Sequence, residues 1–423
     1  MNTILDRLEQ EGMKSLYPSI PAIAVGMGTC GVGSGADSVF TAFAALQKEQ
    51  PEAFMLRKVG CFGCCSEEPL VLLSQPNKPM VLLHKVHKED CLSIVEALQD
   101  GTYYGEKAFC KISTWDHHLS FHTYGDDYPE LPEWNEIPFF RSQVKLVLRD
   151  AGLIDPTSIA EYVAVGGYRA LEKALFTMDR TSVLDEVKSS KLRGRGGAGF
   201  PTGLKWELMK KEESEKKFLI CNADEGDPGA YMNRNEMESD PHMLIEGMLI
   251  ASYVTGAQEG IIYVRAEYPL AVKRLHKAIE DAYASNLLGK DILEANMHFD
   301  LQVVEGAGAF VCGEETALIA SLEGRAGRPR SKPPFPSQKG YLGYPTTINN
   351  LETWCNIPLI IGKGSSWFIQ YGIPSSPGTK VFSLVGKVKH TGLVELPLGE
   401  KLTTLVYEAG GGAVSKNKRI KAV

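Results

Sequence analysis

The amino-acid sequence predicts an α/β protein built from several domains. Its 423 residues correspond to about three domains of roughly 150 residues each. Apolar residues make up 43% of the chain and charged residues 23%, which is the composition of an ordinary globular protein. In the middle of the chain, apolar segments that suit strands alternate with amphipathic segments that suit helices. This alternation indicates a parallel sheet covered by helices.

The first hundred residues predict a small α/β domain, which we place at 1–100. Its expected elements are, in order, a strand at 21–28, a helix on which Val39, Phe40, Phe43 and Leu46 share one face, strands at 53–60, 67–73 and 79–86, and a helix at 88–99. A crossover helix is thus followed by a hairpin and a closing helix. This order of elements is that of a thioredoxin-like domain.

Residues 101–138 predict a linker, because they are rich in aromatic, acidic and proline residues and show no period. We place a central domain at 139–375. Its expected elements are helices at 141–152, 158–176 and 181–191, followed by strands at 218–222, 260–268 and 298–306 that alternate with helices at 242–256 and 269–285. We therefore expect a parallel sheet in this domain.

The helix expected at 269–285 shows the clearest pattern, since Pro269 suits its first position. The residues expected to form its buried stripe are Val272, Leu275, Ile279 and Tyr283. Residues 376–423 predict a strand, a loop and a helix that begin a third small fold. The final segment, 417–423, has the pattern of a further strand.

Charge and cysteine content exclude several classes of protein. The net charge is 45 − 52 = −7 and no long basic run is present, which excludes a nucleic-acid binder. No stretch approaches the ~18 apolar residues of a spanning helix and residues 1–18 lack a signal peptide, so a cytosolic protein is predicted. The nine cysteines are unevenly spaced, which argues against a disulfide framework. Those interpreted as isolated, buried structural residues are Cys221, Cys312 and Cys355.

A glycine-rich loop is the first candidate binding motif. Gly194, Gly196 and Gly199 have the G-x-G-x-x-G spacing, but the segment before them is helical, so the usual dinucleotide fingerprint lacks its strand. Glycines let backbone amides approach an anion closely, and Arg195 and Lys205 add positive charge. Thr202 is expected to cap the next helix. The loop predicts a site for phosphate or a flat ring, with a merely tight turn as the alternative.

Acidic side chains follow two of the expected strands. The loop after 218–222 contains Asn222, Asp224, Glu225 and Asp227, which suit ribose hydroxyls, a ring N–H or a cation. An acidic turn that caps a helix is the alternative.

The third loop, after 298–306, places Glu314 and Glu315 at the start of a helix, where carboxylates either cap the helix or form a site. A proline-rich loop with Lys332 and Phe335 suits a lid or a ring-stacking platform, or is a plain structural loop. No P-loop, HExxH pair or zinc-spaced set is present. The histidines without partners at ligand spacing are His117, His118, His242 and His276.

Five segments together resemble a known family. They are 194–206, 221–234, 306–324, 330–340 and 345–353. In order and spacing they resemble the NADH-binding flavoprotein subunit of respiratory complex I and its relatives in NAD-dependent hydrogenases and formate dehydrogenases. The resemblance covers roughly 139–423, and the thioredoxin-like extension resembles the hydrogenase branch. It implies an FMN- and NAD-binding α/β domain of the complex I flavoprotein type, then the start of a β-grasp domain of the soluble-ligand-binding type.

The resemblance also implies which residues hold the cofactors FMN and NAD(H). Those expected around FMN are Gly194, Arg195, Gly196, Gly197, Lys205, Asn222, Asp224, Gly313, Glu314, Asn349 and Asn350. Those expected to face the nicotinamide nucleotide are Phe200, Glu225, Asp227, Glu315, Lys332 and Phe335. The sequence departs from the family pattern at Leu208, where an aromatic residue is usual, and at Phe310, where a tyrosine is common. No catalytic acid or base is expected.

The resemblance implies a diaphorase-type subunit of a multi-subunit redox complex. Such a subunit exchanges hydride between NAD(H) and FMN and passes single electrons to iron–sulfur partner subunits, including a 2Fe-2S thioredoxin-like subunit. The acidic loop is expected to repel a 2′-phosphate and so to favour NAD over NADP. The alternative is a non-catalytic wiring or assembly subunit that retains the fold.

Iron–sulfur ligands are incomplete in this chain. Cys30, Cys61 and Cys65 match three positions of a 2Fe-2S site in the N-terminal domain, but Val25 occupies the fourth and Cys64 is only adjacent to Cys65. Because such a cluster takes four ligands, we expect a degenerate domain without one. A 4Fe-4S cluster is expected in a C-terminal region outside this chain, within a longer native polypeptide.

Overall fold

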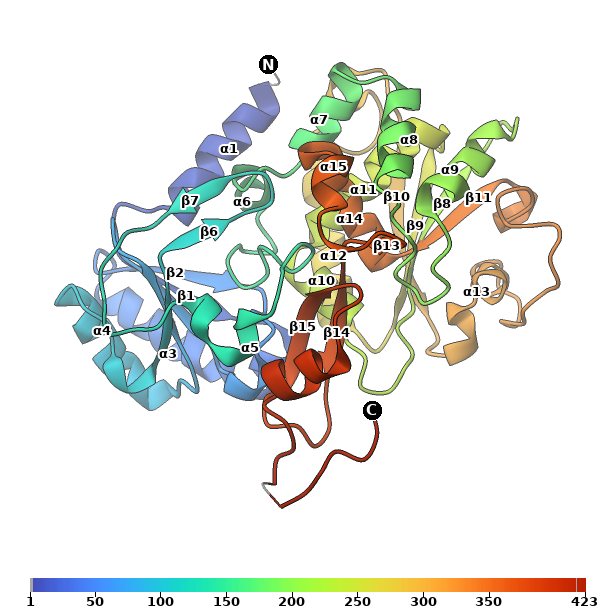
Figure 1. Ribbon diagram of the computed structural model, residues 1–423. Coiled ribbons are helices and arrows are strands. Elements are labelled where there is room, and N and C mark those ends of the chain that lie inside the picture. The colour runs from blue at the N-terminus through green and yellow to red at the C-terminus, as the bar shows by residue number, and fades with distance from the viewer. Residues whose placement is uncertain (1–2, 416) are drawn as a thin grey trace.

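The computed structural model describes residues 3–415 and 417–423, which form two α/β bodies with a β-hairpin between them (Figure 1). The strands of the N-terminal sheet are β1 (Ala22–Gly26), β2 (Met55–Val59), β3 (Val71–Ser74), β4 (Met80–Leu83) and β5 (Ala108–Ile112). Their order is β2-β1-β3-β4-β5, with β1 parallel to β2 and the other pairs antiparallel. The helices are α2 (Thr29–Gly33), α3 (Ala36–Glu49) and α4 (Cys91–Gln99). The elements follow the predicted thioredoxin-like order.

Alternation along the strands gives this sheet two apolar faces. Val25 and Val71 pack with α3 and α4 in one core. Ala24 and Leu72 face the other way, toward Phe140 of the following segment and toward the hairpin. Because both faces are covered, the sheet is buried between its own helices and the rest of the chain.

The segment expected to be a linker, 101–138, contains regular structure. It supplies β5, the fifth strand of the sheet, and a small antiparallel pair formed by β6 (Thr114–Asp116) and β7 (Phe121–Thr123). The N-terminal helix α1 (Thr3–Leu16), which the sequence pattern did not predict, packs on α6 (Ile159–Ala164) of the central body.

The prediction of a helix at 141–152 is wrong. A short helix, α5 (Pro138–Arg141), ends at the first residue of the predicted helix. The chain then contains no helix as far as Ser158. The backbone amides of Val147 and Leu148 donate to the buried Glu395 carboxylate at 3.0 and 2.9 Å. These amides are therefore satisfied by a side chain rather than by a helix.

The next predicted helix, 158–176, is divided in two. It forms α6 and α7 (Arg169–Phe176), and the turn between them contains Gly166 at φ +102°. A Cβ there would lie 2.5 Å from the Leu119 side chain, so this close approach requires glycine.

The central sheet is parallel, in the order β10-β9-β8-β11. Its strands are β8 (Phe218–Ala223), β9 (Glu259–Arg265), β10 (Asp300–Gly306) and β11 (Thr346–Asn350). The helices of this body are α8 (Arg180–Ser189), α9 (Thr202–Lys211), α10 (Met232–Ser239), α11 (Pro241–Thr255), α12 (Pro269–Ala284), α13 (Glu315–Leu322), α14 (Leu351–Lys363) and α15 (Ser365–Phe368). On β8, Leu219 and Cys221 face the large core with α11 and α14, whereas Ile220 faces the small core with α13.

Two expectations for the central body are wrong in detail. Tyr283, expected in the buried stripe of α12, is 40% exposed, and its hydroxyl donates to Asp300. Thr202 does not cap α9: Pro201 precedes the helix, and the buried Thr202 hydroxyl has no partner among the described residues. Cys221, Cys312 and Cys355 are buried, as predicted.

The last portion begins with a two-residue pair, β12 (Gly372–Ile373) and β13 (Ser376–Pro377), followed by a hairpin of β14 (Thr379–Leu384) and β15 (Gly392–Pro397) and a helical turn, η8 (Thr404–Ala409). The second hairpin strand was expected to be a loop. Residues 417–423 form no strand, contrary to prediction. The hairpin side chains Leu384, Val394 and Leu396 pack into the N-terminal body's second core.

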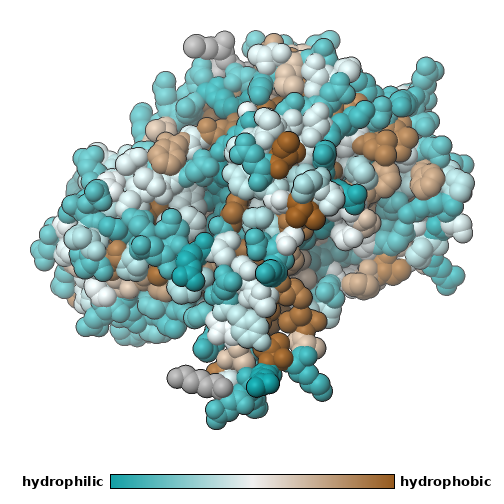
Figure 2. All heavy atoms as spheres, in the orientation of Figure 1, coloured by the Kyte–Doolittle hydropathy of each residue, from teal (hydrophilic) through white to brown (hydrophobic). Residues whose placement is uncertain are grey.

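Most of the face in Figure 2 is hydrophilic, with apolar side chains gathered over the hairpin region. Exposed residues of this region include Val385, Leu402 and Tyr407. Among the described residues, no helix combines the length and apolar character that crossing a membrane requires.

Candidate functional site

The candidate site lies where the strands of the central sheet end. Because β8, β10 and β11 are parallel, the loops that follow them meet at one edge of the sheet, where α/β proteins bind ligands. Two adjoining cavities open there, of about 510 Å³ and about 660 Å³. Asn222, Gly313, Glu314 and Asn350 line both cavities. Each volume lies in the range of ~300–1,000 Å³ that is usual for ligand sites.

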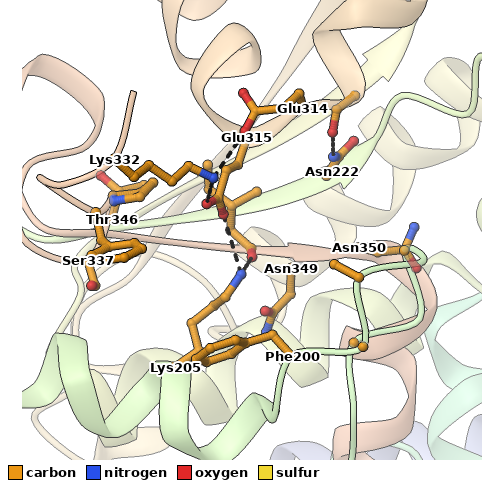
Figure 3. Close-up of a pocket in the computed structure, with 18 of the residues that line it drawn as sticks. Phe200, Lys205, Asn222, Glu314, Glu315, Lys332, Ser337, Thr346, Asn349 and Asn350 are labelled. Carbon is orange, nitrogen blue, oxygen red and sulfur yellow. Dashed lines mark hydrogen bonds and ion pairs between the residues drawn. The ribbon is translucent and has the colours of Figure 1, made fainter. Parts of the chain in front are cut away.

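All of the residues predicted to hold cofactors line one or both cavities. Those on the first cavity are Gly194, Gly196, Phe200, Lys205, Asn222, Gly313, Glu314, Glu315, Lys332, Phe335, Asn349 and Asn350 (Figure 3). Those on the second are Arg195, Gly196, Gly197, Asn222, Asp224, Glu225, Asp227, Gly313, Glu314 and Asn350. The structure thus brings together motifs that lie more than 150 residues apart, while their individual roles remain predictions.

The glycine loop is closed by two backbone hydrogen bonds, Gly194 N–H to Phe200 O and Thr202 N–H to Leu192 O, both at 2.9 Å. Gly197 has φ +105°, and a Cβ built on it meets nothing within 4 Å. At Gly196 a Cβ would lie 3.0 Å from the Cβ of Asn350. The backbone therefore borders open space on one side and β11 on the other.

The two cations of this loop are bound to the protein itself. The Arg195 guanidinium donates to the carbonyls of Arg193 and Pro377, at 2.9 and 2.7 Å, and is 5% exposed. Lys205 donates to the Ile348 carbonyl at 2.8 Å and lies 3.5 Å from a Glu315 oxygen. Burial lowers the pKa of Lys205, and Glu315 opposes this change. Of the two, only the Lys205 ammonium borders the first cavity.

In the acidic loop, one carboxylate oxygen is left without a partner. Asn222 donates to the Gly313 carbonyl at 2.8 Å and accepts from the Asp224 amide at 3.1 Å. The buried Oδ2 of Asp224 has no hydrogen-bond partner among the described residues, and burial raises the pKa of this carboxyl. Because Asp224 lines the second cavity, this oxygen is placed to accept from a ligand N–H or O–H.

Glu225 and Asp227 differ in their surroundings. The Glu225 carboxylate is buried and accepts from the amides of Asn233 and Arg234, at 3.1 and 3.2 Å, in the first turn of α10. It therefore holds a helix terminus, which was the alternative interpretation of this loop. Asp227 is exposed at the rim of the second cavity.

Glu314 both caps a helix and borders the cavity. Its carboxylate accepts from the amides of Thr316 and Ala317, at 2.8 and 3.1 Å, as the N-cap of α13. Lys332 donates to Glu314 at 3.1 Å and to Glu315 at 2.5 Å (Figure 3). Burial acts to raise the pKa of Glu314, but hydrogen bonds from Thr316 and Lys332 lower it overall.

Apolar side chains flank the first cavity. Phe200 is 43% exposed and Phe335 is 52% exposed, although both line the cavity together with Leu208. Aromatic faces left open at a cavity suit a flat heterocycle, since ring stacking contributes about 0.5–1.5 kcal/mol beyond area burial. This arrangement favours the predicted ring-stacking role of the proline-rich loop over a plain structural role.

Sequence reasoning missed Lys380, which comes from β14 in the hairpin. It lines the second cavity, and its ammonium donates to the buried Glu352 carboxylate and to the Val381 carbonyl. No local motif marks this residue, because its position depends on how the hairpin packs on α14. Phe310, noted only as a departure from the family pattern, is 70% exposed and also lines the second cavity.

The three candidate metal ligands Cys30, Cys61 and Cys65 lie together, but the surroundings do not fit a 2Fe-2S cluster. Val25, at the fourth position, is wholly buried among the side chains of α3 and α4. Cys64 packs into the opposite core. Within the ranges that the structure describes, no group of three or more His, Cys, Asp and Glu side chains is arranged to hold a metal ion.

The main cavities, in contrast, fit a flavin nucleotide. They offer an open glycine loop, an ammonium group, an acceptor without a partner and exposed aromatic faces. Flavin mononucleotide presents the matching groups, namely a phosphate, a flat ring and a ring N–H. The donor set therefore agrees with the predicted cofactor.

Comparisons with known proteins agree with this site. A family model described as the Nuo51 FMN-binding domain matches residues 187–359. The NADP-reducing hydrogenase protein HndC of Solidesulfovibrio fructosivorans is 51% identical over 283 residues, 67% of this chain and 57% of that protein. An NADH-quinone oxidoreductase subunit of Aquifex aeolicus (strain VF5) is 46% identical over 296 residues, 70% of this chain and 68% of that protein.

Among solved structures, the chain is similar to the NAD+-reducing NiFe hydrogenase in its H2-reduced state. The TM-score is 0.57 at 26% identity, and the match covers 98% of this chain and 67% of that chain. The match to this structure therefore extends over nearly the whole chain. This chain spans 57% of the length of HndC and 68% of the length of the Aquifex protein.

Proposed function

The chain belongs to the family of NADH-quinone oxidoreductase subunits that contain the Nuo51 FMN-binding domain, and from this premise we propose that it is a diaphorase-type flavoprotein subunit. It exchanges hydride between NAD(H) and FMN and passes electrons singly to iron–sulfur clusters of a larger redox complex. Its partners are iron–sulfur subunits of that complex, including a 2Fe-2S thioredoxin-like subunit, and a 4Fe-4S cluster receives the electrons.

One observation carries the proposal. The matched domain contains the glycine loop, the acidic loop and the loop with Glu314 and Glu315, and these three loops line the two adjoining cavities. The Asp224 oxygen without a partner supports a ligand that donates an N–H there. Phe200 and Phe335 provide open faces for the nicotinamide nucleotide.

Hydride transfer requires that the two rings be positioned, and it requires no proton transfer by side chains. FMN, when bound, accepts a hydride equivalent from NADH and releases electrons one at a time. The chain contributes binding groups on the rigid ends of strands, so two flat rings are held in a fixed relation. Lys205 and Lys332 supply positive charge for phosphates, while their ion pairs with Glu315 hold both ammonium groups in place before a ligand arrives.

Purified protein tests this function directly. We expect bound flavin, bleached by NADH without oxygen. Asp224→Asn should retain less FMN, because an amide offers only one acceptor oxygen. The exposed control Asp126→Asn should retain FMN normally. Full flavin occupancy with no bleaching by NADH or NADPH would instead favour the assembly-subunit alternative.

A further inference from the structure

The hairpin of β14 and β15 supplies one cation to the second cavity. Lys380 of β14 lines this cavity, although the loops described above come from the central sheet and its helices. Its ammonium group donates to the Glu352 carboxylate and to the Val381 carbonyl. An ammonium group has three N–H donors, so these two bonds leave one donor of Lys380 unused. That donor is available to a group bound in the cavity.

The second cation of this cavity contacts the same part of the chain. Among the described lining residues, the cations are Arg195 and Lys380. The Arg195 guanidinium donates at 2.7 Å to the carbonyl of Pro377 in β13, directly before the hairpin. Both terminal nitrogens of Arg195 have backbone acceptors, whereas its buried Nε has no partner among the described residues. Positive charge is thus gathered at the hairpin end of the cavity.

Backbone groups that suit an anion border the same cavity. Gly196 and Gly197 line it, and so does Asn350, the N-cap of α14. A Cβ on Gly196 would lie 3.0 Å from the Asn350 Cβ, so the glycine loop and the start of α14 lie against each other. Glu352, which accepts from Lys380, lies in the first turn of that helix. Because glycine amides and a helix N-terminus both favour an anion, these groups together fit a phosphate.

The carboxyl groups near Lys380 are satisfied by the protein or favoured in their neutral form. Glu352 is wholly buried and accepts from the Lys380 ammonium and, at 3.0 Å, from the Val381 amide. Glu225 accepts from two backbone amides of α10. Burial raises the pKa of Glu236 well above its ordinary value, and repulsion by Glu352 adds to this change. Glu236 is therefore favoured as the neutral acid, which does not repel a phosphate.

The hairpin also connects the cavity to the N-terminal body. On one side, the Ser383 hydroxyl of β14 accepts at 3.1 Å from the amide of Tyr231, which precedes α10. On the other side, the Leu393 amide of β15 donates at 2.8 Å to the carbonyl of Gly63, in the loop after β2. A ligand that binds Lys380 therefore adds a contact to the element that lies between the two bodies.

We propose that the hairpin completes the flavin site, with Lys380 donating its third N–H to the phosphate of FMN. This inference rests on the proposed function and adds a binding residue from outside the matched domain, 187–359. FMN then bridges the hairpin and the start of α14, so cofactor binding and hairpin docking support each other. Riboflavin has the same ring but no phosphate, and it gains nothing from Lys380.

Paired titrations with FMN and riboflavin test the proposal. Flavin fluorescence gives the dissociation constants of the full-length protein, freed of bound cofactor. Lys380→Met should weaken FMN binding at least about tenfold, as expected for a hydrogen bond between charged groups, and leave riboflavin binding nearly unchanged. Lys363→Met is the matched control. Lys363 is 18% exposed, against 19% for Lys380, and its ammonium pairs with Asp116 at the other end of α14.

A second variant separates phosphate binding from folding. Lys380→Met leaves Glu352 buried without its cation, whereas Lys380→Met combined with Glu352→Gln leaves no such charge. The double variant should show the same loss of preference for FMN over riboflavin. Hydrogen exchange gives an independent measurement: FMN should protect the amides of residues 379–384 more than riboflavin does in the native protein, and equally in the double variant.

The outcomes distinguish this inference from the function on which it rests. An unchanged preference for FMN in both variants would overturn the role of Lys380 while leaving the flavin site in place. Equal weakening of FMN and riboflavin in the double variant would also overturn it, because a purely structural role affects both flavins. Native protein that binds neither flavin would refute the proposed function, and this inference with it.

Discussion

At the scale of single residues, most charged groups around the cavities are already bonded to the protein. Glu225 holds α10, Glu314 caps α13, and Arg195 contacts backbone carbonyls. These residues, which the sequence analysis singled out, line the two adjoining cavities, and their cofactor roles stay predictions. The sequence motifs did not predict which oxygens are occupied, because those bonds are made to segments remote in sequence. In the acidic loop, Asp227 and the Oδ2 atom of Asp224 are therefore left open to a ligand, whereas Asp224 Oδ1 lies 3.8 Å from Arg265 Nε.

Asp227 is expected to select between NAD and NADP. Asp227→Asn should raise the use of NADPH relative to NADH by about 5- to 150-fold, equivalent to ~1–3 kcal/mol of relieved repulsion of a 2′-phosphate. The ratio of kcat/KM for the two nucleotides measures this effect. Asp185→Asn, an exposed aspartate on α8, is the matched control. An unchanged ratio would remove Asp227 from cofactor selection, a question sharpened by the similarity to an NADP-reducing hydrogenase subunit.

Glu246 should make stability depend on pH. It is wholly buried on α11 and accepts from the Tyr162 hydroxyl at 2.6 Å and the Tyr168 amide at 2.8 Å. Burial raises its pKa from 4.5 to about 7, so the folded chain keeps this proton when the unfolded chain has lost it. The contribution is complete below pH ~4.5 and is lost as the pH rises through about 7, a change of about 3 kcal/mol at most.

Denaturant unfolding between pH 4.5 and 8 measures this dependence. Glu246→Gln should lower the free energy of unfolding overall but flatten its fall with rising pH, because an amide does not titrate there. Glu49→Gln, at an exposed carboxylate, should leave the slope unchanged. An equal slope in Glu246→Gln would mean that other buried acids, such as Glu68, account for the dependence.

At the scale of elements, periodic patterns predicted β1 to β4 of the N-terminal sheet and β8 to β10 of the central sheet, but neither β5 nor β11. They failed where a remote group replaces local hydrogen bonding. The amphipathic segment 141–152 has a helical pattern, yet its amides bind Glu395, which lies about 250 residues later. Likewise, α1 was not predicted, because its apolar side chains are buried only by packing on α6, which is remote in sequence. Local sequence contains no signal for such partners.

The glycine loop gives a prediction for one element. Gly196→Ala would place a Cβ 3.0 Å from the Asn350 Cβ, so the loop must move away from β11. We expect FMN affinity to fall about tenfold or more, in keeping with the ~1–3 kcal/mol cost of overpacking. Fluorescence of released flavin measures it. Gly33→Ala, where nothing lies within 4 Å, is the control and should bind FMN normally. Equal affinities would show that the loop adjusts freely.

At the scale of the whole molecule, several contacts join the two bodies, among them contacts of the hairpin, of α1 and of β2. The second core of the N-terminal sheet includes hairpin side chains, α1 packs on α6, and a buried ion pair links β2 to α6. In that pair, Arg57 Nη2 lies 2.5 Å from Glu161 Oε2, and both side chains are at most 7% exposed. Glu161 also accepts from Ser15 of α1. The residues are 104 positions apart, so no sequence pattern foretold the pair.

Breaking this pair should destabilise both bodies together. Arg57→Met leaves Glu161 buried without its partner, which costs about 3–5 kcal/mol for such pairs. Adding Glu161→Gln should recover part of the loss. Thermal unfolding, followed separately in each body, measures the effect of the single and of the double substitution. Arg7→Met, which removes one partner of an exposed ion pair, is the control. Separate transitions in the native protein would contradict the expected coupling.

The covered second face of the N-terminal sheet also bears on modular reuse of this chain. A domain that is reused in different fusion proteins has a complete hydrophobic core of its own. Here Ala24 and Leu72 share a core with Leu384, Val394 and Leu396 from the other end of the chain. Excising the thioredoxin-like unit would strip that face, and grafting the flavin-site body without it would expose the hairpin. A fusion that retains both ends of the chain keeps this shared core intact.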